Sequence, residues 1–549
     1  MLTSACAPAA PPAPLTVAQM PAIDTNAVLA DITKLASDEF EGRAPGSKGE
    51  QLTVQYLIDQ FKAAGLEPGN PDGTWVQKVP LVSLTPEPEG PLTVKGAGKS
   101  LTFKPHDDFV AFSKRVTDEV KLENSPIVFV GYGVQAPEFK WDDFKGVDVK
   151  GKTVVVLVND PPVPQAAGTN ALDTAVFGGR AMTYYGRWTY KYDKAAEMGA
   201  DACIIVHETD RAGYGFNVVQ GFGGERFDLV TPDKNMSRAK VESWISLDAA
   251  TALFKAAGLD FQKLKAEAAT REFKPVPLNL NASFALKQKM RTVDSQNVVA
   301  KLTGADPVLK GEYVVYSAHW DHFGIGEEKN GDKIYNGAAD NASGTAGMLE
   351  IARRLKTIQP APKRSSIFVA VTAEEQGLLG SQYYAQFPLY PLNKTVANIN
   401  TDDNLPLWGR TKDVIVIGLG ASDLDDYMRD AAAEQGRVLV PDAEPEKGFY
   451  YRSDHFNFAK VGVPALDIDD GIDYVDKPAG FGRQKKDDYT AKDYHQPSDD
   501  VKADWDLTGA AEQLRMLLAV GYRIANADKM PEWKPGNEFR AVREKSLGK

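Results

Sequence analysis

Histidine and carboxylate side chains that suit a metal centre gather in the second half of the chain. The protein has six histidines in 549 residues, and four of them lie in this half. The imidazoles and carboxylates that directly follow an apolar run, or lie in a nearby loop, are His319, Asp321, Asp340, Glu374, Glu375, Asp402 and His495. Imidazole nitrogen and carboxylate oxygen are ligands that zinc takes in proteins. This set therefore predicts a metal site.

The candidate ligands are too many for one metal ion, because two imidazoles and three carboxylates are more than one tetrahedral zinc binds. If one carboxylate bridges, each of two ions receives one imidazole, one terminal carboxylate and a shared oxygen. Two ions about 3.5–4 Å apart form a hydrolytic clamp around a shared water. A free carboxylate beside that water acts as a general base. The adjacent Glu374 and Glu375 offer this division, with one bound to metal and one free.

Each of these residues, taken alone, could instead have a purely structural role. A single histidine at a strand end is most often a polar cap, and an acidic pair after a strand suits the start of a helix. Asp340, in front of the segment NASG, suits a helix N-cap. The metal site is favoured because these residues fall together, at strand ends or in adjoining loops, within one α/β unit.

The elements that would position the ligands follow from an alternation that begins at Ser295. Runs such as YVVYSAH and SSIFVAVTA predict buried strands, and segments such as SGTAGMLEIARRLKT predict helices. The predicted fold class is α/β, with a mainly parallel mixed sheet between helices on both faces. In such sheets ligands bind beyond the carboxyl ends of the strands.

Composition argues against several classes of protein. Hydrophobic residues make up 43% and charged residues 25%, which is ordinary for a globular protein of two to four domains. The net charge of −12 argues against a nucleic-acid binder. No apolar run approaches the roughly 20 residues that span a membrane. Two cysteines form neither a disulfide framework nor a CxxC zinc site.

Five segments extend the argument from chemistry to a family. HWDH, YNGAADNASG, TAEEQGLLGS, NINTD and YHQPSDD, in this order, resemble the motifs of the co-catalytic zinc exopeptidases. That family includes bacterial leucyl aminopeptidases, glutamate carboxypeptidase and the inactive transferrin receptor. The resemblance covers most of residues 24–525. It implies the zinc-exopeptidase, phosphorylase/hydrolase-like fold, two Zn²⁺ per chain, peptide substrates and, most of all, aminopeptidase activity.

The resemblance also assigns roles. The residues that would hold zinc are His319 and Asp402 for one ion, Glu375 and His495 for the other, and Asp340 as the bridge. Glu374 would be the general base that activates a metal-bridging water. Asp321 would hold the His319 ring through its other nitrogen. The peptide bond after Asp340 is expected to be cis. Every metal-ligand position is occupied, which argues against the inactive receptor branch.

A second, β-rich unit is expected within the catalytic domain. The run VFVGYGVQAPEFKWDDFKGVDVKGKTVVVLVNDPP resembles the protease-associated (PA) domain, which we place at 126–290. The catalytic domain would take 24–125 and 291–530, after a signal or linker remnant at 1–23 and before a C-terminal tail at 531–549.

Three residues are candidates for contact with the substrate. Tyr185 and Arg187 belong to an aromatic and cationic cluster that lines the substrate cleft or forms a domain interface. His455, in YRSDHFNF, is expected to touch substrate or the transition-state oxyanion rather than metal.

Other functions remain open. A carboxypeptidase would need a cationic pocket, which Arg187, Arg452 or Arg483 could supply. A glutaminyl cyclase shares the fold with a single zinc, and a receptor-like module would have no activity. The start MLTSACAPAAPPAP resembles the end of a truncated bacterial lipoprotein signal. We therefore expect export, either to the periplasm or as an outer-membrane lipoprotein with its lipid on Cys6, and the alternative is a disordered tail with an accidental cysteine.

Overall fold

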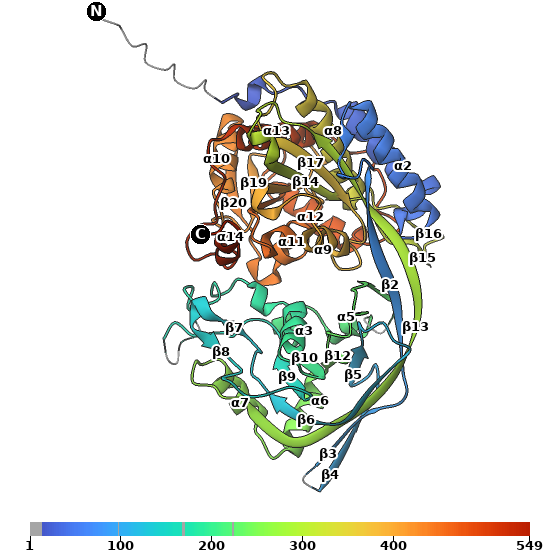
Figure 1. Cartoon of the computed structure of the whole chain (residues 1–549), viewed down its shortest axis with the longest axis vertical. Coiled ribbons are helices and arrows are strands. Elements are labelled where there is room, and N and C mark those ends of the chain that lie inside the picture. The colour runs from blue at the N-terminus through green and yellow to red at the C-terminus, as the bar shows by residue number, and fades with distance from the viewer. Residues whose placement is uncertain (1–13, 97, 167–168, 170, 222–223) are drawn as a thin grey trace, which may run out of the picture.

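A computed structural model gives the fold of residues 14–96, 98–166, 169, 171–221 and 224–549. It has an upper and a lower lobe joined by a long two-stranded ribbon (Figure 1). The ribbon pairs β2 (Val76–Pro88) antiparallel with β13 (Val276–Leu302). Cys6, the residue that would carry the lipid of a lipoprotein, and residues 1–13 of the expected remnant at 1–23 lie outside the described residues.

The upper lobe is built on one sheet. Its strands, in order across the sheet, are β1 (Glu67–Pro68), the C-terminal part of β13, β17 (Ser365–Val371), β14 (Tyr313–His319), β18 (Thr395–Asn400), β21 (Ala465–Asp469), β19 (Asp413–Ile417) and β20 (Val438–Pro441). The central strands β17, β14, β18 and β21 run parallel, whereas β13 and β19 run antiparallel to their central neighbours. The mainly parallel sheet predicted from the alternation is confirmed.

Helices cover both faces of this sheet (Figure 1). One face carries α1 (Thr25–Leu35), α2 (Lys48–Ala63), α8 (Gly344–Thr357), α10 (Leu424–Glu434) and α13 (Thr508–Asn526), and the other carries α9 (Leu379–Gln386), α11 (His455–Lys460) and α14 (Arg540–Ser546). A hydrophobic core lies on each face of this sheet. Successive side chains of β14 pack alternately in these two cores, because successive strand residues point to opposite faces. Val314 and Tyr316 pack in the first core, and Val315 packs in the second.

The lower lobe has a second sheet, into which the far end of β13 extends. Its strands, in order, are β4 (Lys99–Phe103), β3 (Leu92–Gly96), β13, β6 (Glu119–Phe129), β9 (Thr153–Leu157), β10 (Ala202–Val206), β12 (Val241–Ile245) and β5 (Phe109–Phe112). The helices of this lobe are α3 (Trp188–Glu197), α4 (Thr209–Ala212), α5 (Phe216–Gln220), α6 (Leu247–Ala256) and α7 (Phe261–Ala268). The other strands and the other α-helix of the described residues are β7 (Gln135–Ala136), β8 (Trp141–Asp142), β11 (Arg226–Leu229), β15 (Gly324–Lys329), β16 (Asp332–Tyr335) and α12 (Phe481–Lys492).

The core of the lower lobe begins earlier in the chain than we expected. Leu92 and Val120 pack in the same cluster as Phe129 and Phe254. Residues 92–125, which we expected in the catalytic part, therefore belong with the lower lobe. The physical reason is that β3 and β6 pair with the outer half of β13, which the ribbon carries away from the upper lobe. That this lobe is a PA domain stays a prediction.

The segment expected to form a C-terminal tail packs on the upper lobe instead. Trp533 is 1% exposed, and its indole N–H donates to the carbonyl oxygen of Gly462 at 2.9 Å. The Arg543 guanidinium donates to the carbonyl oxygen of Thr395 at 2.8 Å. Residues beyond 530 are therefore part of the folded upper lobe.

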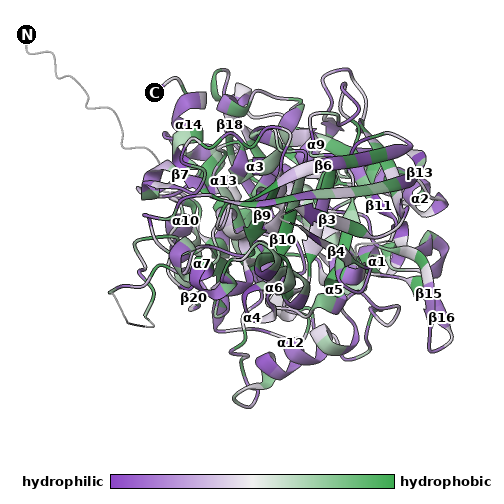
Figure 2. Cartoon of the chain, turned by 90° about the horizontal axis from the view of Figure 1, so that it is seen from below, coloured by the Kyte–Doolittle hydropathy of each residue, from purple (hydrophilic) through white to green (hydrophobic). Residues whose placement is uncertain are grey.

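Hydropathy follows the layers. In Figure 2, hydrophobic residues concentrate on the inner strands, and the outer surfaces of the peripheral helices are largely hydrophilic. Among the described residues, no helix has both the length and the apolar character needed to cross a membrane.

Candidate metal centre

The fold brings the predicted ligands together at the carboxyl edge of the upper sheet. His319 is the last residue of β14, and Asp402 comes two residues after the end of β18. Glu375 lies in the segment after β17, and Asp340 lies in the turn that leads into α8. His495 comes from the loop after α12. Parallel strands end at one edge of a sheet, so residues far apart in sequence meet there.

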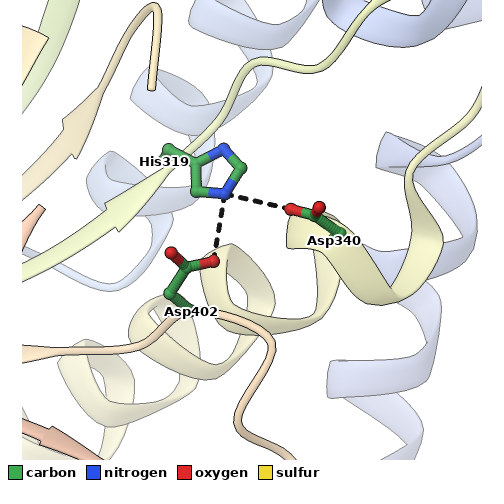
Figure 3. Close-up of side chains that lie close together, drawn as sticks. All are labelled: His319, Asp340 and Asp402. Atoms are coloured by element: carbon green, nitrogen blue, oxygen red, sulfur yellow. Dashed lines mark hydrogen bonds and ion pairs between the residues drawn. The ribbon is translucent and has the colours of Figure 1, made fainter. Parts of the chain in front are cut away.

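His319 contacts two of the carboxylates. Its Nε2 atom lies 3.0 Å from Asp402 Oδ1 and 3.2 Å from Asp340 Oδ1 (Figure 3). Its Nδ1 atom lies 3.1 Å from the backbone oxygen of Asp321, whereas the Asp321 carboxylate is 3.8 Å away. The Asp321 carboxylate instead accepts the backbone N–H of Glu374 at 3.1 Å. Asp321 thus orients the histidine through its main chain and the acidic pair through its side chain.

The second oxygen of Asp340 faces a different histidine. Asp340 Oδ2 lies 3.2 Å from His495 Nε2, and that nitrogen lies 3.3 Å from Glu375 Oε2. His322 also reaches this group, with its Nδ1 atom 2.5 Å from Glu375 Oε1. Two groups able to hold a metal ion share Asp340, one completed by His319 and Asp402 and the other by His322 and Glu375.

The electrostatics of the cluster call for a cation. Burial is the largest cause that raises the pKa of Glu374 and of Glu375 well above the usual range, and neighbouring carboxylates raise it further although His319 lowers it. Burial disfavours charge on His319, but Asp402 and Glu374 outweigh burial and raise the pKa of this imidazole. His322 Nε2 is buried without a hydrogen-bond partner in the described structure, and the close contact between His322 Nδ1 and Glu375 Oε1 lacks hydrogen-bond geometry. Divalent cations satisfy such atoms and neutralise such charge.

The candidate ligands are held by further hydrogen bonds. The Ser453 hydroxyl donates to Asp402 Oδ2 at 2.5 Å. The Asp499 carboxylate accepts the backbone N–H groups of Ala339 and Asp340, each at 3.1 Å. Burial raises the pKa of Asp499 to about 6. These contacts orient Asp402 and the turn that carries Asp340.

The turn also contains the expected cis peptide bond, between Asp340 and Asn341. The Asn341 side chain donates to the backbone oxygen of Thr401 at 3.0 Å and accepts the backbone N–H of Gly344 at 2.9 Å. It therefore links the start of α8 to the residue that follows β18.

Comparison with known proteins agrees with this geometry. Residues 297–519 match the family described as peptidase family M28, and all the candidate ligands lie within that stretch. This part of the chain is a peptidase family M28 domain.

Curated relatives of the M28 domain match only parts of the chain. Aminopeptidase NAALADL1 of Mus musculus is 34% identical over 131 residues, which cover 23% of this chain and 16% of that protein. A probable zinc metalloprotease of Pyrenophora tritici-repentis is 29% identical over 274 residues, covering 44% of this chain and 53% of that protein. The matches thus span from about a sixth to about half of these relatives. A solved structure, an aminopeptidase from Aneurinibacillus sp. strain AM-1, aligns with 94% of this chain and 95% of that chain at 19% identity and a TM-score of 0.46.

A buried arginine that the motifs did not indicate ties the M28 domain to the N-terminal segment. Arg43 is 1% exposed, and burial lowers its pKa to about 10. Its guanidinium donates to the backbone oxygens of Trp320 at 2.8 Å, Asn336 at 2.5 Å and Gly337 at 2.8 Å. It also donates to the oxygen of Leu35 at 2.8 Å. Arg43 thereby joins the loops that carry His319 and Asp340, and only long-range contacts reveal it.

Replacing Arg43 by leucine is expected to lower the free energy of unfolding by about 3 kcal/mol or more, because four buried carbonyl groups lose their donor. Arg429→Leu is the matched control, because its exposed ion pair with Asp426 contributes at most about 1 kcal/mol. Urea unfolding of both variants measures the difference. Equal effects would show that the carbonyl oxygens find other partners.

The three residues proposed to contact substrate lie in different surroundings in the structure. The Tyr185 hydroxyl donates to Glu138 at 2.6 Å, and its ring packs on Phe177 within the lower lobe. His455 is fully buried, packs its ring on Tyr450, and has its pKa lowered to about 3 by burial. Neither residue contacts the candidate ligands directly. Arg187 follows the turn Tyr184–Gly186 directly before α3 of the lower lobe, and among the described residues its buried Nε atom has no hydrogen-bond partner.

Proposed function

We propose that the protein is a zinc-dependent aminopeptidase that removes N-terminal residues from peptides. The observation that carries the proposal is the shared carboxylate of Asp340. One of its oxygens lies 3.2 Å from His319, and the other lies 3.2 Å from His495. Asp402 and Glu375 complete two separate groups around it. The M28 domain and the names of its relatives support the same activity.

The donor set fits two zinc ions, because imidazole and carboxylate are zinc ligands and one carboxylate can serve both ions. The proposed ligands are His319 and Asp402 for one ion, Glu375 and His495 for the other, and Asp340 for both. His322 contacts Glu375 and is assigned to orienting this carboxylate. When bound, the two ions supply Lewis acidity for the peptide carbonyl and lower the pKa of a water.

Glu374 is the proposed general base. It belongs to neither ligand group, and its Oε2 atom lies 4.0 Å from His319 Nε2. The hydrogen bond from its backbone to Asp321 fixes the start of its side chain. The Glu374 carboxylate takes a proton from the attacking water and passes it to the leaving amine.

Negative charge beside the centre favours a free N-terminus over a free C-terminus. Burial raises the pKa of Asp403 well above its usual range, and the nearby Asp340, Asp469 and Asp470 raise it further. The negative potential of the carboxylates that contribute to this raised pKa also favours the ammonium group of a substrate over a terminal carboxylate. This arrangement supports the aminopeptidase over the carboxypeptidase.

A panel of aminoacyl p-nitroanilides tests the proposal. We expect release of p-nitroaniline that a chelator abolishes and added zinc restores. N-acetylated versions of the same compounds should not be cleaved, because they lack the ammonium group. Cleavage of N-blocked peptides from their carboxyl ends would instead establish a carboxypeptidase.

A further inference from the structure

A cavity of about 250 Å³ lies next to the turn that carries Asp340. Its lining comes from α12, from the segment after β18 and from the loop that leads to α13. Ala339 lines it, whereas none of the candidate metal ligands is among the described residues of the lining. The volume is just below the ~300–1,000 Å³ of ordinary ligand pockets, so the cavity suits one small molecule rather than a peptide.

The lining combines apolar surface with charges of both signs. Leu407, Trp408 and Trp505 supply the apolar surface. The charged residues of the lining are Lys485, Lys492, Lys502, Asp488, Asp493, Asp499 and Asp504. Each of the lysines lies within ion-pair distance of an aspartate of the same lining. Such a cavity favours a molecule that carries both charges beside an apolar group over a simple anion or cation.

Asp499 has room for a cation. It is 1% exposed, and among the described residues no lysine, arginine or histidine lies within ion-pair distance of it. Its Oδ2 atom accepts the hydroxyl of Tyr489 at 3.3 Å and the backbone N–H of Asp340, whereas Oδ1 accepts only the backbone N–H of Ala339. A carboxylate oxygen accepts two hydrogen bonds, so Oδ1 can take one more. An ammonium group would also balance the buried negative charge.

Lys485 presents a positive charge to the same cavity. It lies four residues before Tyr489 on α12, so the two side chains share one face of the helix. Its Nζ atom lies 5.0 Å from the centroid of the Trp408 ring and donates to Asp504 at 2.7 Å. A lysine ammonium has three donors, and an ion pair with a carboxylate as exposed as Asp504 stabilises weakly. Lys485 can therefore also bind a carboxylate in the cavity.

We propose that this cavity binds a free α-amino acid with an apolar side chain. Asp499 holds its ammonium group and Lys485 holds its carboxylate, while the side chain packs against Trp408 and Trp505. The inference goes beyond the proposed function, which supplies only a source of the ligand, because an aminopeptidase releases free amino acids. The site adjoins the metal centre, since the Asp499 carboxylate also holds the turn of Asp340.

Equilibrium dialysis of labelled L-leucine against the full chain, treated with chelator, tests the proposal. We expect saturable binding of about one leucine per chain. 3-Methylbutylamine lacks the carboxylate, 4-methylpentanoic acid lacks the ammonium group, and glycine lacks the apolar side chain. Each should compete about tenfold more weakly or worse, because each loses one of the three contacts. Absence of saturable leucine binding, or equal competition by any of the three compounds, would overturn the proposal.

Replacing Lys485 by methionine removes the charge and keeps a long side chain. The Kd for leucine should rise about tenfold or more. Lys263→Met is the matched control, because Lys263 is a 73% exposed lysine of α7 that pairs with Glu267, and it should leave the Kd unchanged. Lys485→Gln, with the same expected effect, replaces the methionine variant if that variant does not fold. An unchanged Kd in a folded Lys485 variant would overturn the proposal, because leucine would then bind elsewhere, such as at the acidic metal centre.

The readouts separate this inference from the proposed function. Dialysis with chelator-treated protein measures binding without turnover, whereas release of p-nitroaniline by zinc-loaded protein measures the peptidase activity. If no peptide is hydrolysed, the peptidase proposal fails, and leucine binding that depends on Lys485 still supports the cavity site. If peptides are hydrolysed but leucine binding does not depend on Lys485, the proposed function stands and this inference is overturned.

Discussion

Replacing Glu374 by glutamine is expected to reduce kcat by roughly 10²–10⁴ while the zinc content stays unchanged. Glutamine keeps the size of the side chain but cannot accept the proton of the attacking water. The zinc is retained because Glu374 lies outside both candidate ligand groups. The separation of activity from metal content is the specific expectation, since a damaged fold would reduce both.

The measurement pairs steady-state hydrolysis of an aminoacyl p-nitroanilide with elemental analysis of the same preparation. Glu272→Gln serves as the control, because Glu272 is an exposed residue of the lower lobe. It should match the unmodified protein in both quantities. Normal turnover by Glu374→Gln would remove this residue from the mechanism. Loss of zinc along with turnover would make it a ligand.

Replacing Asp340 by asparagine is expected to have a still broader effect, with loss of zinc from both positions and a loss of activity at least as large as for Glu374→Gln. An amide offers one acceptor oxygen, whereas Asp340 presents one carboxylate oxygen to His319 and the other to His495. The lost negative charge also weakens the attraction for two divalent ions.

Asp402→Asn is the matched comparison, because Asp402 faces only the His319 side of the centre. It should weaken one zinc position and leave the other occupied. Elemental analysis after dialysis, with circular dichroism as a check on folding, compares the two variants. Two retained ions in Asp340→Asn would contradict the shared-carboxylate arrangement.

The gathering of the ligands was predictable because it depends on local patterns. Apolar runs predict strands, and the alternation with helices makes the strands parallel, so His319 and Asp402 end at the same edge of the sheet. The cis peptide bond after Asp340 was predictable only through the family resemblance. Neither the alternation of strands and helices nor the family resemblance requires knowledge of the contacts between distant segments.

The remaining features depend on such contacts. Arg43 bonds to backbone oxygens, which every residue carries, so its partners leave no mark in the sequence. The resemblance likewise predicted that Asp321 holds His319 through its other ring nitrogen, but the sequence did not reveal that the backbone oxygen of Asp321 makes this contact. The start of the lower lobe was misplaced because β13 is one continuous strand that serves both lobes.

The most direct test of the account is the number of zinc ions bound per chain. Zinc is titrated into chelator-treated protein, with bound metal and the release of an N-terminal residue followed together. We predict that about two zinc ions bind per chain, in agreement with two ligand groups around Asp340, and that activity returns with them. Saturation at one ion, or no binding at all, would contradict the shared-carboxylate centre.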